Sequence, residues 1–134
     1  MKKILSIFLS ICTLCLLMPT VVFAQVPSGL HYSESGDTVK ITEYVGDATE
    51  VEIPDTIDGK TVTEIGEYAF FGTNVESVKI PDGVTSIGMY AFRNCYVLKN
   101  INIPESVTSI GQGAFFACAS LENIKLPSGI TSIS

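Results

Sequence analysis

The sequence contains a single histidine, His31, so there is no second imidazole with which it could form a catalytic pair. Acid–base and nucleophilic catalysis depend on such pairs of titratable groups. Asp55 and Asp58 lie close together in the sequence, but they flank a turn-like segment with Gly59, where carboxylates are usually solvated. The composition therefore predicts no catalytic residues and no cofactor, and it argues against an enzyme.

Metal ligands and positive charge are also scarce. The sequence has no Asp-x-Asp-x-Asp run for calcium, and its one histidine is remote in sequence from Cys95 and Cys118. Eight Lys and Arg residues stand against fourteen Asp and Glu residues, which gives a net charge of −6. Because nucleic acids and anionic membranes are bound through basic patches, we expect no metal site, no nucleic acid partner and no binding to a membrane surface.

One long apolar run is present, at the N-terminus. Lys2 and Lys3 precede apolar residues 4–23, and cleavage is expected between Ala24 and Gln25, in the order typical of a secretory signal peptide. A retained membrane anchor is the alternative, because about 20 apolar residues can span a bilayer, but Pro19 and the polar interruptions favour cleavage. We predict a signal peptide over residues 1–24, membrane contact only through it, and a secreted or cell-surface protein.

Residues 25–53 predict an N-terminal β cap. Segments 30–32 and 38–44 alternate apolar and polar residues on either side of Gly36, which is typical of a β-hairpin. A third alternating segment, 50–53, matches residues 77–80 further along the chain. Ten of the fourteen acidic residues lie between Glu34 and Glu67. Polar outer positions suit a cap that shields the end of an apolar core from water.

The rest of the chain, residues 54–134, consists of near-copies of one segment. Three complete copies begin at Pro54, Pro81 and Pro104, and a truncated fourth begins at Pro127. The second and third copies are 23 residues long, and the first has an insertion after its proline. One copy cannot bury its apolar face alone, so the copies must stack into a solenoid with a continuous core. The expected core includes Ile65, Phe70, Ile87, Phe92, Cys95, Ile110, Phe115 and Cys118.

Each copy is expected to form one coil. An alternating segment ends in proline, which has no N–H to continue strand pairing. A second extended segment, Val84–Ile87 in the second copy, is followed by Gly88, where a positive φ would favour glycine. Residues 89–93 are long enough only for one helical turn. We predict a mainly β, right-handed solenoid with short parallel strands, single helical turns at the corners, a buried column of Phe70, Phe92 and Phe115, and a row of Thr85, Thr108 and Thr131.

Cys95 and Cys118 occupy the same position in successive copies. Neighbouring strands lie about 4.8 Å apart, so the two Cα atoms would be within reach of a disulfide, and secretion would permit one. Equivalent side chains in stacked coils point the same way, however, which leaves the Cβ atoms slightly too far apart for a bridge. A ladder of free thiols acting as small hydrophobes is favoured, and the disulfide stays open as the alternative.

The repeat reads Val-Thr-Ser-Ile-Gly-x-x-Ala-Phe-x-x-Cys-x-x-Leu-x-x-Ile-x-Ile-Pro from Val84 to Pro104 and resembles the BspA-type leucine-rich repeat. The resemblance covers Val51 to the end, with departures at Gly72-Thr73, where the other copies have cysteine, and at Ser134, where they have glycine. It implies a curved leucine-rich repeat solenoid with a parallel sheet. It also implies a secreted or surface protein of host-associated bacteria or some protists that adheres to host proteins or other cells.

The same resemblance implies that outward side chains on the sheet form the ligand face. They make two rows that start at Glu50 and Glu52 and continue through the candidate ligand residues Ser77, Lys79, Asn100, Asn102, Asn123 and Lys125. A polar face that is merely solvated is an equally good interpretation of any one of them.

We therefore predict a non-catalytic extracellular or cell-surface module that binds or adheres to a protein or glycan of a host or neighbouring cell. The alternatives are a structural spacer within a longer surface protein and a targeting arm of a secreted enzyme. A fold alone does not decide between these functions.

The fourth copy stops at Ser134, before its corner and returning strand. Solenoids need a polar cap over the last coil, and an uncovered strand edge pairs readily with other chains. We expect either a longer native protein that continues the array or self-association at the uncapped C-terminal end.

Overall fold

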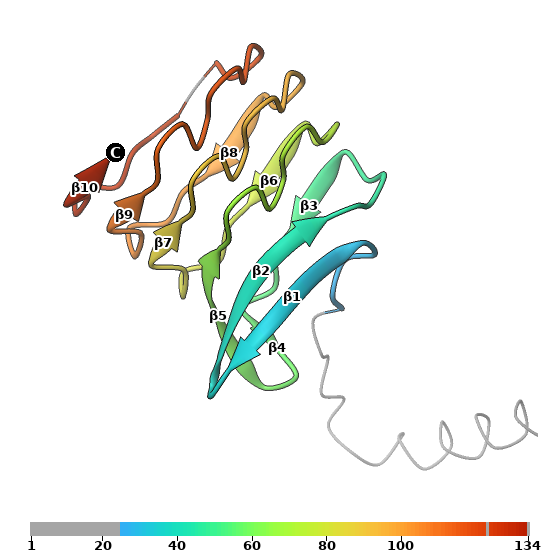
Figure 1. Cartoon of the computed structure of the whole chain (residues 1–134), viewed down its shortest axis with the longest axis vertical. Coiled ribbons are helices and arrows are strands. Elements are labelled where there is room, and N and C mark those ends of the chain that lie inside the picture. The colour runs from blue at the N-terminus through green and yellow to red at the C-terminus, as the bar shows by residue number, and fades with distance from the viewer. Residues whose placement is uncertain (1–24, 123, 134) are drawn as a thin grey trace, which may run out of the picture.

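The computed structural model describes residues 25–122 and 124–133, so the predicted signal peptide and Ala24 lie outside the described residues. The described chain winds into a solenoid whose coils lie side by side, from an N-terminal hairpin to a C-terminal strand (Figure 1). The described residues contain ten strands: β1 (Leu30–Ser35), β2 (Thr38–Tyr44), β3 (Glu50–Glu52), β4 (Thr56–Ile57), β5 (Lys60–Ile65), β6 (Ser77–Lys79), β7 (Ser86–Ile87), β8 (Asn100–Asn102), β9 (Ser109–Ile110) and β10 (Ser132–Ile133).

The strands form two sheets. The long sheet has the order β1-β2-β5-β7-β9-β10, with β4 paired to β5, and the short sheet has the order β3-β6-β8. Pairing between successive coils is parallel and joins equivalent residues, so that Ile87 lies between Ile65 and Ile110. Pairing in register with the sequence repeat confirms the predicted solenoid of stacked coils with short parallel strands.

The strands β1 and β2 form the predicted antiparallel hairpin around Gly36. Strand β2 then pairs in parallel with β5 and places Ile41 beside Ile65. The hairpin therefore covers the side of the first repeat that no other repeat covers, and it contributes four buried side chains to the core: Leu30, Val39, Ile41 and Tyr44.

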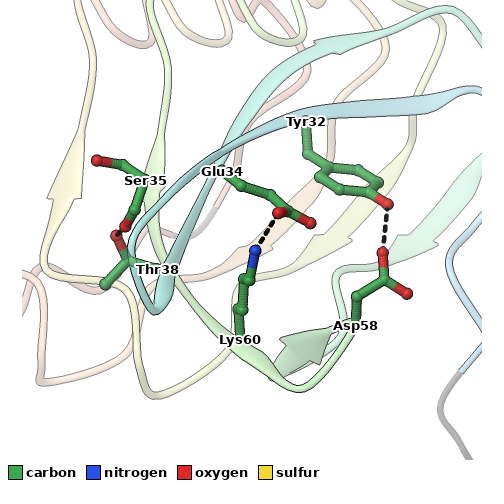
Figure 2. A network of polar contacts seen from close by, with 6 residues as sticks. All are labelled: Tyr32, Glu34, Ser35, Thr38, Asp58 and Lys60. Atoms are coloured by element: carbon green, nitrogen blue, oxygen red, sulfur yellow. Dashed lines mark hydrogen bonds and ion pairs between the residues drawn. The ribbon is translucent and has the colours of Figure 1, made fainter.

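The insertion in the first copy forms β4 and the start of β5. These strands are joined by Asp58 and Gly59, whose φ angles of 51° and 77° are typical of a two-residue hairpin turn. Figure 2 shows how this hairpin is held against the cap: the Tyr32 hydroxyl donates a 2.9 Å hydrogen bond to Asp58, and Lys60 pairs with Glu34. The hydrogen bond to Asp58 raises the pKa of Tyr32.

The corners differ from the prediction of helical turns. Residues 89–93 and 112–116 form turns, and each contains one residue in the left-handed region, Tyr90 (φ 54°) and Gly113 (φ 59°) respectively. A right-handed helical turn needs consecutive residues in the right-handed region. A single left-handed residue interrupts that run, so the prediction of helical corners from segment length was wrong.

The corner glycines have a different role from the one predicted. Gly88 and Gly111 do not adopt a positive φ. A Cβ atom at Gly88 would lie 2.6 Å from the backbone nitrogen of Glu67, and one at Gly111 would lie 2.5 Å from that of Met89. Glycine is required here because the backbones of consecutive coils approach too closely for any side chain.

The core runs along the solenoid axis. The rings of Phe70, Phe92 and Phe115 stack in one column, with centroid separations of 5.0 Å and 5.5 Å. Phe115 and Cys118, expected in the core, are only half-buried. They lie in the third coil, and the described part of the fourth copy brings no phenylalanine or cysteine to stack on them. The other expected core residues are buried: Ile65, Phe70, Ile87, Phe92, Cys95 and Ile110.

Replacing Phe92 by alanine is expected to lower the free energy of unfolding by about 3–5 kcal/mol, the usual cost of truncating a buried phenylalanine. Phe92 has no exposed surface and lies between two other rings. The control is Phe116→Ala, because the Phe116 side chain is 59% exposed. This substitution is expected to lower the free energy of unfolding by about 1 kcal/mol or less. Urea unfolding followed by circular dichroism measures both, and equal losses would contradict the stacked core.

Apolar side chains are exposed near the C-terminal edge of the solenoid, where β10 ends the long sheet (Figure 1). Leu126 and Ile133 are exposed to 45% and 63%. Because an exposed apolar edge pairs readily with another chain, we expect that a fragment limited to residues 25–134 would show an average mass, from sedimentation equilibrium, that rises with protein concentration. Ile133→Lys should reduce the rise, and a constant monomer mass would contradict self-association.

Candidate ligand-binding surfaces

The outward side chains of the short sheet form two rows across β3, β6 and β8. One row contains Glu50, Ser77 and Asn100, and the other contains Glu52, Lys79 and Asn102. Ser77 is half-buried and the other five are exposed. We call these six residues the sheet face. Of the remaining candidate ligand residues, Asn123 lies outside the described residues, and Lys125 is exposed but belongs to no described strand.

Lysine and glutamate side chains pair between adjacent coils on and beside the sheet face. Lys79 Nζ lies 2.5 Å from Glu52 Oε1, and Lys99 Nζ lies 2.6 Å from Glu76 Oε2. The hydrogen bond to its glutamate raises the pKa of each lysine. The sheet face therefore presents one neutralised pair, two amides, one hydroxyl and the carboxylate of Glu50, which suits a partner that forms hydrogen bonds with it.

The predicted threonine row lies along the long sheet. The amides of Thr108 and Thr131 each donate a 2.9 Å hydrogen bond to the carbonyl of the preceding threonine in the row. The hydroxyls of the same residues donate to the same carbonyls, at 3.4 Å and 3.1 Å. These hydroxyls are engaged in joining the coils, so the row is structural.

A second surface lies at the corners, and the sequence reasoning missed it. Tyr68 and Phe71 contact each other edge to face, with ring centroids 5.7 Å apart, and Tyr68 lies 5.4 Å from Tyr90. Arg93 and Phe116 continue the group along the solenoid. We call these five residues the corner strip. Tyr68, Phe71 and Phe116 are exposed to 47%, 46% and 59%. One sequence feature could have predicted the corner strip. The position directly after the core phenylalanine carries a large side chain in each copy: Phe71, Arg93 and Phe116.

The guanidinium of Arg93 lies between two aromatic rings. Its Cζ atom is 4.8 Å from the Tyr90 ring centroid and 5.2 Å from the Phe116 ring centroid, both within the range of cation–π contacts. Its Nε atom is buried without a hydrogen-bond partner. Beside it lies an open hollow of about 350 Å³ lined by Tyr90, Arg93, Gln112, Gly113 and Phe116.

Two tyrosines of the corner strip occupy a backbone conformation that usually favours glycine. Tyr68 and Tyr90 have φ angles of 57° and 54°, and the equivalent residue of the third copy is Gly113, with φ 59°. A residue with a Cβ atom costs roughly 1–2 kcal/mol in this region. The tyrosine rings are therefore held at the surface against a backbone preference.

The two described cysteines are free thiols. Cys95 Sγ donates a hydrogen bond to the Phe70 carbonyl at 2.9 Å, and Cys118 Sγ donates to the Phe92 carbonyl at 3.0 Å. Each thiol points to the backbone of the preceding coil rather than to the other thiol, which is the free-thiol ladder that the sequence favoured. Burial raises the pKa of Cys95, and burial together with the neighbouring Cys95 raises the pKa of Cys118 to about 11.

Comparison with known families identifies the repeat. A family model described as BspA type leucine rich repeat region (6 copies) matches residues 43–134. The chain belongs to this family. No curated protein matches the chain significantly.

Solved structures of bacterial leucine-rich repeat proteins have the same fold. The protein of T. pallidum is 32% identical, with a TM-score of 0.75, over 80% of this chain and 52% of that one. The chain thus spans about half the length of that relative. A leucine-rich repeat protein of Bacteroides capillosus is 31% identical, with a TM-score of 0.74, over 83% of this chain and 86% of that one. A leucine rich cell surface protein of Faecalibacterium prausnitzii is 26% identical, with a TM-score of 0.60, over 81% and 38%.

Two structural features are absent from residues 25–122 and 124–133. This part of the chain contains no helix with the length and apolar character needed to cross a bilayer. It also contains no group of three or more His, Cys, Asp or Glu side chains placed to hold a metal ion.

The raised thiol pKa values predict slow alkylation of Cys95 and Cys118 in the folded protein. Only the thiolate reacts, and burial keeps both thiols protonated at pH 8. We expect iodoacetamide to modify the two residues at pH 8 much faster in urea than in buffer, as measured by mass spectrometry of tryptic peptides. Modification of Cys118 in the folded protein should accelerate only as the pH approaches about 11. A disulfide-linked peptide containing both residues would contradict the free-thiol arrangement.

Proposed function

We propose that this protein is a non-catalytic binding module at the cell exterior, and that the sheet face is the surface that contacts a protein or glycan of a host or neighbouring cell. The observation that carries the proposal is the pairing of β3, β6 and β8 in exact register, which aligns exposed polar side chains in rows. Family membership and the likeness to a leucine rich cell surface protein support a location outside the cell.

The geometry of the sheet face favours recognition of an extended partner. Strand spacing sets the distance between equivalent side chains at about 4.8 Å, so Asn102 and Lys79 present hydrogen-bonding groups at neighbouring points of one flat surface. The backbone beneath is fixed by ladder pairing on both sides of β6. A partner therefore binds without ordering this surface, which lowers the entropic cost of association.

A spacer or targeting arm is the second candidate function. It is favoured by the size of the T. pallidum relative, of which this chain covers 52%. In a longer protein of that kind, the repeats would hold another domain away from the cell surface and the sheet face would bind nothing. Measurement of binding to the repeats separates the two functions.

The proposal is tested by replacing Lys79, Asn102 and Lys125 together by alanine. Binding of the purified protein to immobilised extracellular-matrix proteins and to a glycan array is expected to weaken at least tenfold, since residues at the centre of an interface dominate its affinity. The matched control replaces Lys40, Lys60 and Asn74, the same residue types located away from the sheet face. Binding that survives the first triple substitution would reject the sheet face, and no binding by the unaltered protein would favour the spacer.

A further inference from the structure

We propose that the corner strip is a docking surface for a protein partner that places a carboxylate side chain against Arg93 and an apolar side chain in the adjacent hollow. The corner strip shares no residue with the sheet face, so either proposal can fail without the other.

Among the residues that the structure describes, Arg93 differs from the lysines in having no acidic partner. Each of the five lysines in the described residues lies within 4 Å of a glutamate. Arg93, the only arginine of the chain, forms no ion pair with any described residue. In a chain with fourteen acidic residues, this one cation is left available for a carboxylate from outside.

Two aromatic rings restrict the orientation of the Arg93 guanidinium. Tyr90 and Phe116 contact it at 4.8 Å and 5.2 Å, and its Nε atom is buried without a partner. A guanidinium presents donors in a planar fork that matches both oxygens of a carboxylate. Restricting that orientation in advance reduces the entropy lost when a carboxylate binds.

The rings of the corner strip favour a protein partner over a glycan. A sugar that stacks on an aromatic residue needs an open ring face. The Tyr90 ring is already approached by Arg93 at 4.8 Å and by the Tyr68 ring at 5.4 Å, and Arg93 also lies over Phe116. These contacts occupy part of the Tyr90 and Phe116 ring surfaces, and the hollow of about 350 Å³ beside them suits an apolar side chain. Tyrosine, phenylalanine and arginine are also the residues enriched at protein–protein contacts.

The backbone supports the same assignment. Tyr68 and Tyr90 adopt the left-handed conformation that the third copy fills with Gly113. The conformation is common to all three corners, and the first two copies carry a tyrosine there in spite of its cost. In addition, a Cβ atom at Gly113 would lie 2.5 Å from Cε1 of Tyr90. Glycine at this position therefore leaves room for the ring that supports Arg93.

The test uses the single Arg93 Nε–H signal in nitrogen-15 NMR spectra, which identifies the site without ambiguity because the chain has one arginine. The probe is a pool of synthetic peptides with a central glutamate between randomised apolar residues, and the matched probe has glutamine instead. The glutamate pool should shift the signal in a saturable way, and the glutamine pool should leave it unchanged. An oligosaccharide of hyaluronan, which carries carboxylates on sugars, tests the glycan alternative.

Variants then separate binding from folding, with affinity for a fluorescent peptide of the glutamate pool measured by anisotropy. Arg93→Gln is expected to weaken binding about tenfold. Lys125→Gln removes the same charge elsewhere and should change affinity less than twofold. Tyr90→Gly relieves the left-handed backbone but removes the ring, so it should keep the circular dichroism spectrum and lose affinity.

Three results would overturn the proposal. The first is no shift of the Arg93 signal with the glutamate pool. The second is an equal shift with the glutamine pool, because the carboxylate would then have no role. The third is a shift with the hyaluronan oligosaccharide alone, which would assign the corner strip to an acidic glycan.

Discussion

Each coil of this solenoid must lie one strand spacing from the next, in register, and the other structural features follow from that constraint. The spacing of about 4.8 Å lets the Phe70, Phe92 and Phe115 rings stack at 5.0–5.5 Å and bury one another. It also brings backbones so close at Gly88 that a Cβ atom would lie 2.6 Å from Glu67. The same approach lets the Cys95 thiol reach the Phe70 carbonyl at 2.9 Å. Burial, hydrogen bonding and the choice of glycine are thus three consequences of one distance.

The fold was predictable from sequence because a solenoid repeats its burial pattern. A fixed period of 23 residues, with apolar residues at the same positions, leaves few arrangements other than stacked coils. The hairpin around Gly36 followed from alternation alone. The free-thiol arrangement followed from the direction of equivalent side chains. These predictions depend on which residues are alike from copy to copy, and such information is present in the sequence itself.

What the sequence did not predict concerns backbone conformation and differences between copies. Glycine is equally suited to a positive φ and to close backbone approach, so its recurrence at position 88 and its equivalents did not reveal which of the two applied. The corner segment is short enough for a helical turn, and the left-handed φ of Tyr90 is unusual for its residue type. The corner strip was not predicted because alternation of apolar and polar residues identifies outward positions only in strands. In a turn no such period exists.

The two candidate surfaces differ in how they use the repeat. On the sheet face, every equivalent position carries a polar side chain, although its charge changes from coil to coil, so the surface offers hydrogen-bonding groups along its length and suits an extended partner. In the corner strip, equivalent positions carry Phe71, Arg93 and Phe116, so one cation lies between aromatic residues at a single point along the axis. Side chains of one kind repeated in every coil can contact a partner anywhere along the solenoid. A side chain present in one coil only can fix the position at which a partner binds. A repeat protein therefore gains specificity where its copies differ, and in the corner strip of this chain the copies differ at Arg93.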